Sequence, residues 1–356
     1  GRFPVAAFQL TAQSRSDIDK FLSGRRVRSR VQNSGFVDRL FRQHADWWSS
    51  ETYVFSGARL NASGQVRGAA CRLGSYLDML DTADYLELEL LASSAAQAEA
   101  VTLSALPYRK QLLKGFATAR ECVLSGGGVS ATIGISVLVV FPHRGSYHAL
   151  VERRPKRIGP NGSMYHVIPA MLHQPIQTLS GALEHATPRD SIFREYLEEL
   201  FGLAEPHIAP SDSPKQVVAS HPNHLFLTSL LQGGRARLEG VAMAFNLLNH
   251  RPDLCMLLLI DDEAWFDAQS GSAKRKTKSG LWRLSAVKAR QFQRQVDEQS
   301  LTGALPIRSP LWAAMVTPEN ASPPGAAAIA LGMRRACELL GIREPRWLAS
   351  LACRFS

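Results

Sequence analysis

Three glutamates and an arginine lie close together in one stretch of the sequence, Arg194-Glu195-Tyr196-Leu197-Glu198-Glu199. Residues three and four positions apart lie on the same side of an α-helix, so a helix here would place Glu195, Glu198 and Glu199 on one face. Carboxylates at this spacing repel one another by about 0.3 kcal/mol per pair. A positive charge nearby would offset this repulsion. Mg²⁺ and Mn²⁺ prefer carboxylate and water oxygens, so the stretch predicts a metal site. The alternative is a solvent-exposed acidic face on which Arg194 pairs locally.

The glutamates need a helix to position them, and the sequence contains the signals for one. Thr187 can cap the first turn, where Pro188 is favourable, and Gly202 follows the last turn. We therefore expect a helix over 188–201. Apolar residues at helical spacing supply the face that would anchor this helix in a core: Ile192, Phe193, Tyr196, Leu197 and Leu200.

Strands are expected on both sides of this helix. Residues 133–141 are rich in Val, Ile and Leu and predict a buried strand, and residues 147–153 alternate like its hairpin partner. A third strand is expected over 165–172. After the helix, the pattern predicts strands over 225–232, 236–246 and 256–260, and a helix or turn that begins at Asp261.

The regions that flank this part have other patterns. Three consecutive glycines are costly to order, so Ser125-Gly126-Gly127-Gly128 predicts a boundary. We divide the chain into an N-terminal mixed α/β domain (1–125), a central domain (126–270) and a mostly helical C-terminal extension (271–356). Outside the central domain we expect strands over 53–55 and 66–73, and helices over 16–41, 75–91, 108–124 and 326–340.

The central domain resembles the Nudix hydrolase family. The Nudix box has the core pattern Arg-Glu-apolar-x-Glu-Glu-x-Gly-apolar, and the match is complete from Arg194 to Glu199, with Tyr196 in the apolar place. It then departs from the pattern, because Leu200 and Phe201 precede Gly202 where the family usually has one residue. Upstream, Pro169-Ala170-Met171 is similar to the family's Leu-Pro-Gly-Gly strand end, with both glycines replaced and a longer loop before the box.

The resemblance implies an α/β (α+β) fold class, with a Nudix-like α/β/α sandwich and a mixed sheet in the central domain. It implies hydrolysis of a nucleoside-diphosphate-linked (NDP-X) or related pyrophosphate substrate, with Mg²⁺ or Mn²⁺ as cofactor. Glu195, Glu198 and Glu199 would hold the metal, which would shield the anionic pyrophosphate and orient a water. Glu198, Glu199 and Arg194 would be the catalytic residues, with Arg194 orienting the glutamates. The general base could be Glu198, Glu199 or a residue outside the box.

Basic residues after the second predicted strand are candidates for substrate binding. Arg153, Arg154 and Lys156 lie on that strand and its loop, where they could contact phosphate. A solvated strand edge explains the same residues without a ligand.

Histidines and a second acidic stretch are further candidates. His221 and His224 have a metal-ligand spacing, but Pro222 between them opposes a helical metal pair. Asp261-Asp262-Glu263 could complete a metal site or form the acid-rich first turn of a helix. Three more histidines flank the proposed site: His166, His173 and His185.

Composition limits the classes of function. The chain has 356 residues, of which 45% are hydrophobic and 20% charged, and this excludes disorder as the dominant state. No apolar run approaches the length of about 18 residues that a membrane span needs. The five cysteines are widely spaced and include no Cys-x-x-Cys pair, which disfavours a disulfide framework or a cysteine-rich zinc site. A reducing, cytoplasmic location is therefore expected.

The net charge suits an anionic partner. Lys and Arg exceed Asp and Glu by 41 − 31 = 10, with basic clusters at Arg25–Arg30 and Lys274–Lys278. A small nucleotide-type substrate is favoured. Nucleic acid ranks last, because the sequence has no helix-turn-helix, zinc-finger or RNA-binding signature. The alternative function is a catalytically weak, Nudix-like nucleotide- or metabolite-binding regulatory module, because the upstream half of the box is altered. A homodimer also stays open, since dimers are common in this family.

Overall fold

The computed structural model describes residues 8–10, 51–63, 66–96, 100–154, 163–175, 187–201, 214–270 and 303–354. Several sequence-based expectations fall outside these residues: the helix over 16–41, both basic clusters, Lys156 and His185. None of the helices in the described ranges is long and apolar enough to cross a lipid bilayer.

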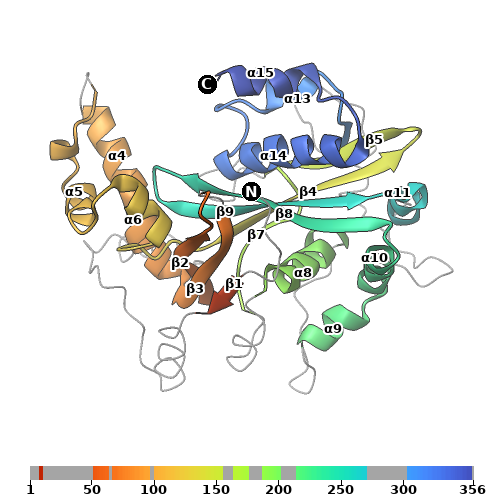
Figure 1. Cartoon of the computed structure of the whole chain (residues 1–356), viewed down its shortest axis with the longest axis horizontal. Coiled ribbons are helices and arrows are strands. Elements are labelled where there is room, and N and C mark those ends of the chain that lie inside the picture. Colours follow the sequence, from red (N-terminus) through yellow and green to blue (C-terminus); the bar gives the residue numbers. More distant parts are fainter. Residues whose placement is uncertain are drawn as a thin grey trace.

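Seven of the described strands form one mixed sheet in the order β10-β5-β4-β9-β8, with β6 added to β5 and β7 added to β4 (Figure 1). The central pair, β4 and β9, is parallel, and the other pairs are antiparallel. The strands are β4 (Gly134–His143), β5 (Ser146–Arg153), β6 (Tyr165–His166), β7 (Ala170–Leu172), β8 (Ala236–Asn246), β9 (Arg251–Ile260) and β10 (Gly303–Pro306).

Helices cover both faces of this sheet, which confirms the predicted α/β class. Alternate residues of β4 point to opposite faces, so Val137 and Val139 enter one core cluster and Leu138 and Val140 enter another. The first face carries α8 (Pro188–Phe201), α9 (Pro214–Ser220), α10 (Pro222–Gln232) and α11 (Glu263–Ser270). The second carries α14 (Pro323–Leu340), with α13 (Leu311–Met315) and α15 (Arg346–Arg354) packed beyond it, as Figure 1 shows above the sheet.

The N-terminal part forms a smaller sheet in the order β1-β3-β2, with β1 (Phe8–Leu10) parallel to β3 (Val66–Ser75) and β2 (Glu51–Leu60) antiparallel to it. Tyr53 and Phe55 of β2 belong to the same core cluster as α8. Packing therefore crosses the boundary predicted near 125. The helical elements that follow are α3 (Tyr76–Met79), a π-helical turn η2 (Leu80–Asp84), α4 (Tyr85–Ala96), η3 (Leu103–Ala105), α5 (Pro107–Leu113) and α6 (Ala119–Ser125).

The C-terminal part also packs across its predicted limit. β10 pairs with β5 and lengthens the sheet, and α14 forms the second helical layer. The helix expected over 326–340 is confirmed by α14, which begins after the Ser322 cap and ends at Gly341. Packing thus crosses both predicted limits, and the division of the chain into three folding units stays a prediction.

Three predicted elements are wrong in detail. The strand expected over 225–232 is helix α10, in which Leu227 and Leu230, three positions apart, are buried on one side. The strand expected over 165–172 is divided into β6 and β7 at Pro169, which has no N–H to donate to a ladder. The helix expected over 108–124 is two helices, because a second one starts at the Thr118 cap.

Candidate functional site

α8 is the element that positions the acidic residues. Its apolar side is buried in the core, as the sequence predicts, through Ile192, Tyr196, Leu197 and Leu200. The buried hydroxyl of Tyr196 accepts a hydrogen bond of 3.1 Å from Nε1 of Trp265 on α11. Burial raises the pKa of this hydroxyl well above its usual value. This contact fixes the middle of α8 against α11 and leaves the acidic side turned away from the core.

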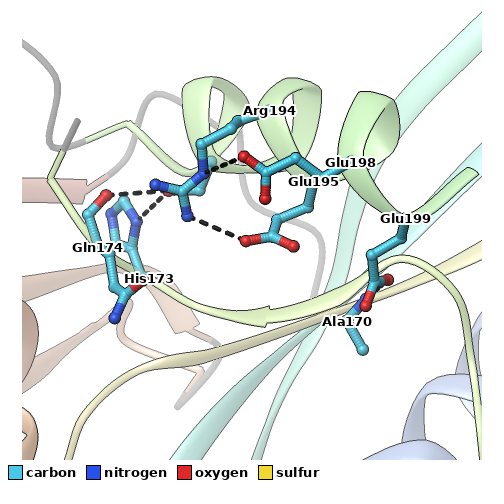
Figure 2. Close-up of polar contacts among 8 residues, drawn as sticks. Ala170, His173, Gln174, Arg194, Glu195, Glu198 and Glu199 are labelled. Atoms are coloured by element: carbon cyan, nitrogen blue, oxygen red, sulfur yellow. Dashed lines mark hydrogen bonds and ion pairs between the residues drawn. The ribbon is translucent and has the colours of Figure 1, made fainter. Parts of the chain in front are cut away.

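Arg194 organises two of the three glutamates. Its Nη2 donates a hydrogen bond of 3.0 Å to Oε1 of Glu195, and its Nε lies 3.8 Å from Oε1 of Glu198 (Figure 2). The three side chains are only 15–17% exposed. Water therefore screens their charges less than on an open surface, and the Arg194 contacts hold both carboxylates in place.

Glu199 is held by a different partner. Its Oε2 accepts a hydrogen bond of 3.0 Å from the backbone N–H of Ala170, the first residue of β7. Figure 2 shows Glu199 directed toward Ala170, on the far side of Glu195 and Glu198 from His173. The acidic stripe, which we define as Glu195, Glu198 and Glu199, therefore spans α8 from its middle to its end and touches the start of β7.

The acidic stripe offers only carboxylate oxygens, which are the ligands that hard dications such as Mg²⁺ prefer. Its arrangement does not bring the three carboxylates to one point. In the described part of the chain, no group of three or more His, Cys, Asp or Glu side chains is arranged to hold a metal ion. Arg194 pairs with Glu195 and Glu198, so binding of a shared ion requires these side chains to rotate.

The candidate histidines that are described have structural contacts. His173 is buried, and its Nδ1 lies 2.9 Å from Oγ of Ser191 on α8. His166 is also buried, and burial, reinforced by the charge of Arg154, lowers its pKa to about 4. It is therefore neutral at pH 7. His221 caps α10, with Nδ1 accepting from the N–H of Asn223.

The second acidic stretch stabilises the start of α11. Asp262 accepts from the N–H of Ala264 at 2.9 Å and forms an ion pair with Arg235 at 2.6 Å. Asp261 accepts a hydrogen bond of 2.9 Å from the hydroxyl of Tyr147. These contacts fit the alternative of an acid-rich helix N-terminus.

Two of the three candidate phosphate-binding residues are described: Arg153 is the last residue of β5, and Arg154 follows it. Nε of Arg153 donates to the carbonyl of Ser163 at 2.7 Å, and its guanidinium lies 5.9 Å from the centroid of the Tyr165 ring. The backbone of Arg154 exchanges hydrogen bonds with Ser163 and Met164. Arg153 is thus held along its own hairpin, and a role in phosphate binding stays a prediction.

Two contacts of the site were not anticipated from the sequence. The backbone N–H of Ala170 carries no sequence signal as a partner for Glu199. Ser191 carries a weak one, because it is a polar residue three positions before Arg194 and four before Glu195, on their side of α8, and it is buried. A hydroxyl at such a place needs a buried partner, and His173 is that partner.

A scan of the chain against known protein families and a search among curated proteins found no match. The functional proposal therefore depends on the box motif and on the geometry described above.

Proposed function

We propose that the chain is a metal-dependent hydrolase of Nudix type, acting on a nucleoside-diphosphate-linked or related pyrophosphate substrate. One observation carries the proposal: three half-buried glutamates follow one side of α8, and a single guanidinium pairs with two of them. Arg194 and the acidic stripe together have a formal charge of 1 − 3 = −2. A dication is the ligand that neutralises this charge with the fewest added groups.

Each residue of the site has a role in this proposal. Glu195, Glu198 and Glu199 would hold Mg²⁺ or Mn²⁺, which when bound shields the pyrophosphate and acidifies a water. Arg194 orients Glu195 and Glu198 through the contacts of 3.0 and 3.8 Å. The N–H of Ala170 keeps the carboxylate of Glu199 at the end of the sheet. The general base is Glu198 or Glu199 if it belongs to the box.

A second function is favoured by a specific observation. All three carboxylates of the acidic stripe already have protein partners, and Ala170 and Met171 stand where the Nudix pattern has glycines. A regulatory module that binds a nucleotide or metabolite without hydrolysing it would need the fold but not a metal-loaded site. Such a module would be stabilised by its ligand and release no product.

The test is a panel of nucleoside diphosphate sugars, dinucleotides and nucleoside triphosphates, each with Mg²⁺ or Mn²⁺. Release of a nucleoside monophosphate or of pyrophosphate is measured for the parent, Glu198→Gln and Glu199→Gln. Glu344→Gln is the matched control, because Glu344 also pairs with an arginine, Arg334, at 3.1 Å but lies outside α8. The hydrolase proposal expects loss of at least about 100-fold in the two box variants and none in the control. Thermal stabilisation by a panel member without turnover would support the binding module instead.

A further inference from the structure

We propose that His173 is a positioning residue for the acidic stripe, and that Tyr53 of the N-terminal sheet positions His173 in turn. The N-terminal β2 then forms part of the site, although it ends 188 − 60 = 128 positions before α8 begins. The consequence for metal binding depends on the proposed function. The contacts of His173 with Tyr53 and Ser191 exist whether or not a metal binds.

Three backbone segments meet at His173 in a closed ring of hydrogen bonds. The N–H of Tyr53 donates to the carbonyl of His173 at 2.9 Å, and the N–H of His173 donates to the carbonyl of Ile133 at 2.8 Å. The N–H of Ile133 completes the ring by donating to the carbonyl of Tyr53 at 3.0 Å. These residues lie in β2, just after β7 and just before β4. The ring therefore joins the N-terminal sheet to the central sheet at the residue that contacts α8.

The side chain of His173 continues this connection to α8. Its Nδ1 lies 2.9 Å from Oγ of Ser191, and that hydroxyl donates to the carbonyl of Gln174 at 3.4 Å (Figure 2). Nδ1 of His173 can donate to the Ser191 oxygen while the Ser191 hydroxyl donates to Gln174, and this placement of the hydrogens satisfies both contacts. His173 and Ser191 are both buried, so water does not replace a lost partner there.

Ser191 is at the head of the acidic stripe. It precedes Arg194 by three positions and Glu195 by four, so all three lie on one side of α8. A hydrogen bond at Ser191 therefore fixes the rotation of the helix about its axis and, with it, the direction of the carboxylates. Trp265 holds the opposite side of the same helix through Tyr196. The two anchors together allow α8 one orientation.

Tyr53 fixes the ring of His173. The two ring centroids are 4.4 Å apart at an interplanar angle of 43°, and both residues are fully buried. The imidazole is thus held by its neighbour's ring on one side and by Ser191 at its Nδ1. Because both the backbone and the ring of Tyr53 contact His173, a displacement of β2 is transmitted to Ser191.

Hydrogen exchange in α8 and Mn²⁺ affinity test the proposal on the full chain. His173→Phe keeps a ring against Tyr53 but removes Nδ1, and Ser191→Ala removes the hydroxyl that Nδ1 contacts. Thr132→Val is the matched control, because its hydroxyl is equally buried near the junction but bonds Thr52 at 3.0 Å. Amides 194–199 should exchange about fivefold to tenfold faster in His173→Phe and Ser191→Ala than in the control. The double variant should exchange no faster than Ser191→Ala, since loss of the Ser191 hydroxyl already removes its contact with His173.

Mn²⁺ affinity, measured from the free-ion electron paramagnetic resonance signal, gives the second readout. It should fall about tenfold in His173→Phe and Ser191→Ala and stay unchanged in Thr132→Val. His173→Asn, which keeps an N–H at the Nδ1 position, should recover part of the affinity, and Tyr53→Leu should weaken it. Exchange and affinity equal to those of the control would overturn the proposal. If the parent binds no Mn²⁺ and hydrolyses nothing, the proposed function fails, and the exchange comparison alone decides the positioning role.

Discussion

Replacement of Arg194 by Met gives the sharpest test of how the acidic stripe is held. Met has a similar length and a similar helix propensity, so the change removes the charge and the donors and little else. The hydrogen bond to Glu195 at 3.0 Å joins two charged groups, and such bonds contribute about 1.5 kcal/mol at the lower end of their range. The contact of 3.8 Å to Glu198 adds about 0.5 kcal/mol. Arg194→Met should therefore lower the free energy of unfolding by about 2 kcal/mol.

Urea denaturation at pH 7.5 measures this value, and a double-mutant cycle isolates the pair. Arg194→Met, Glu195→Gln and the double variant should give a coupling energy of about 1–1.5 kcal/mol. Arg194→Lys is the matched control, because lysine keeps the positive charge but lacks the planar guanidinium group. It should recover less than half of the unfolding free energy that Arg194→Met loses. A coupling energy below about 0.3 kcal/mol would mean that water screens this pair as on an open surface. Arg194 would then not hold the carboxylate of Glu195 in place.

Three further predictions concern buried residues of the central sheet and of the helices on its two faces. Burial raises the pKa of Asp253 to about 6, above its unfolded value of 3.8, so the stability it contributes is present at low pH and lost as the pH rises through 6. Asp253→Asn should therefore be more stable than the parent by about 3 kcal/mol at pH 8 and no more stable below pH 4, as measured by urea denaturation across pH. Gly332→Ala should lower the melting temperature despite its gain in helix propensity, because a Cβ there would lie 3.0 Å from Cβ of Leu138; an unchanged value would mean that α14 shifts freely. Trp265→Phe should leave the buried Tyr196 hydroxyl without its donor and cost about 1–3 kcal/mol, whereas a cost near zero would show that water reaches it.

Local signals account for the parts of the fold that the sequence predicted. α8 was predictable because its signals, the residues of its first turn and the spacing of its apolar residues, all lie within its own 14 residues. The buried strand β4 was predictable for the same reason. α10 was mistaken for a strand because Leu225, Phe226 and Leu227 form a short apolar run, which periodicity alone cannot distinguish from a helical segment. The cap at His221 and the proline after it were the better signal.

Contacts between distant segments account for what the sequence could not predict. β10 has only four residues, too few to show a strand pattern. It pairs with β5 about 150 positions earlier, and nothing in its own sequence indicates this partner. The acidic stripe could be predicted from one helical turn. Its partners could not, because the N–H of Ala170 and the ring of Tyr53 reach α8 only through the tertiary fold.

Titration of Mn²⁺ into the parent chain and Glu198→Gln, followed by the free-ion paramagnetic signal, measures whether the carboxylates of α8 bind a metal ion. We expect the parent to bind the ion and Glu198→Gln to weaken binding at least tenfold, while Glu344→Gln does not. Equal affinity in all three chains, or no binding by the parent at millimolar Mn²⁺, would contradict the claim that the carboxylates of α8 form a metal site.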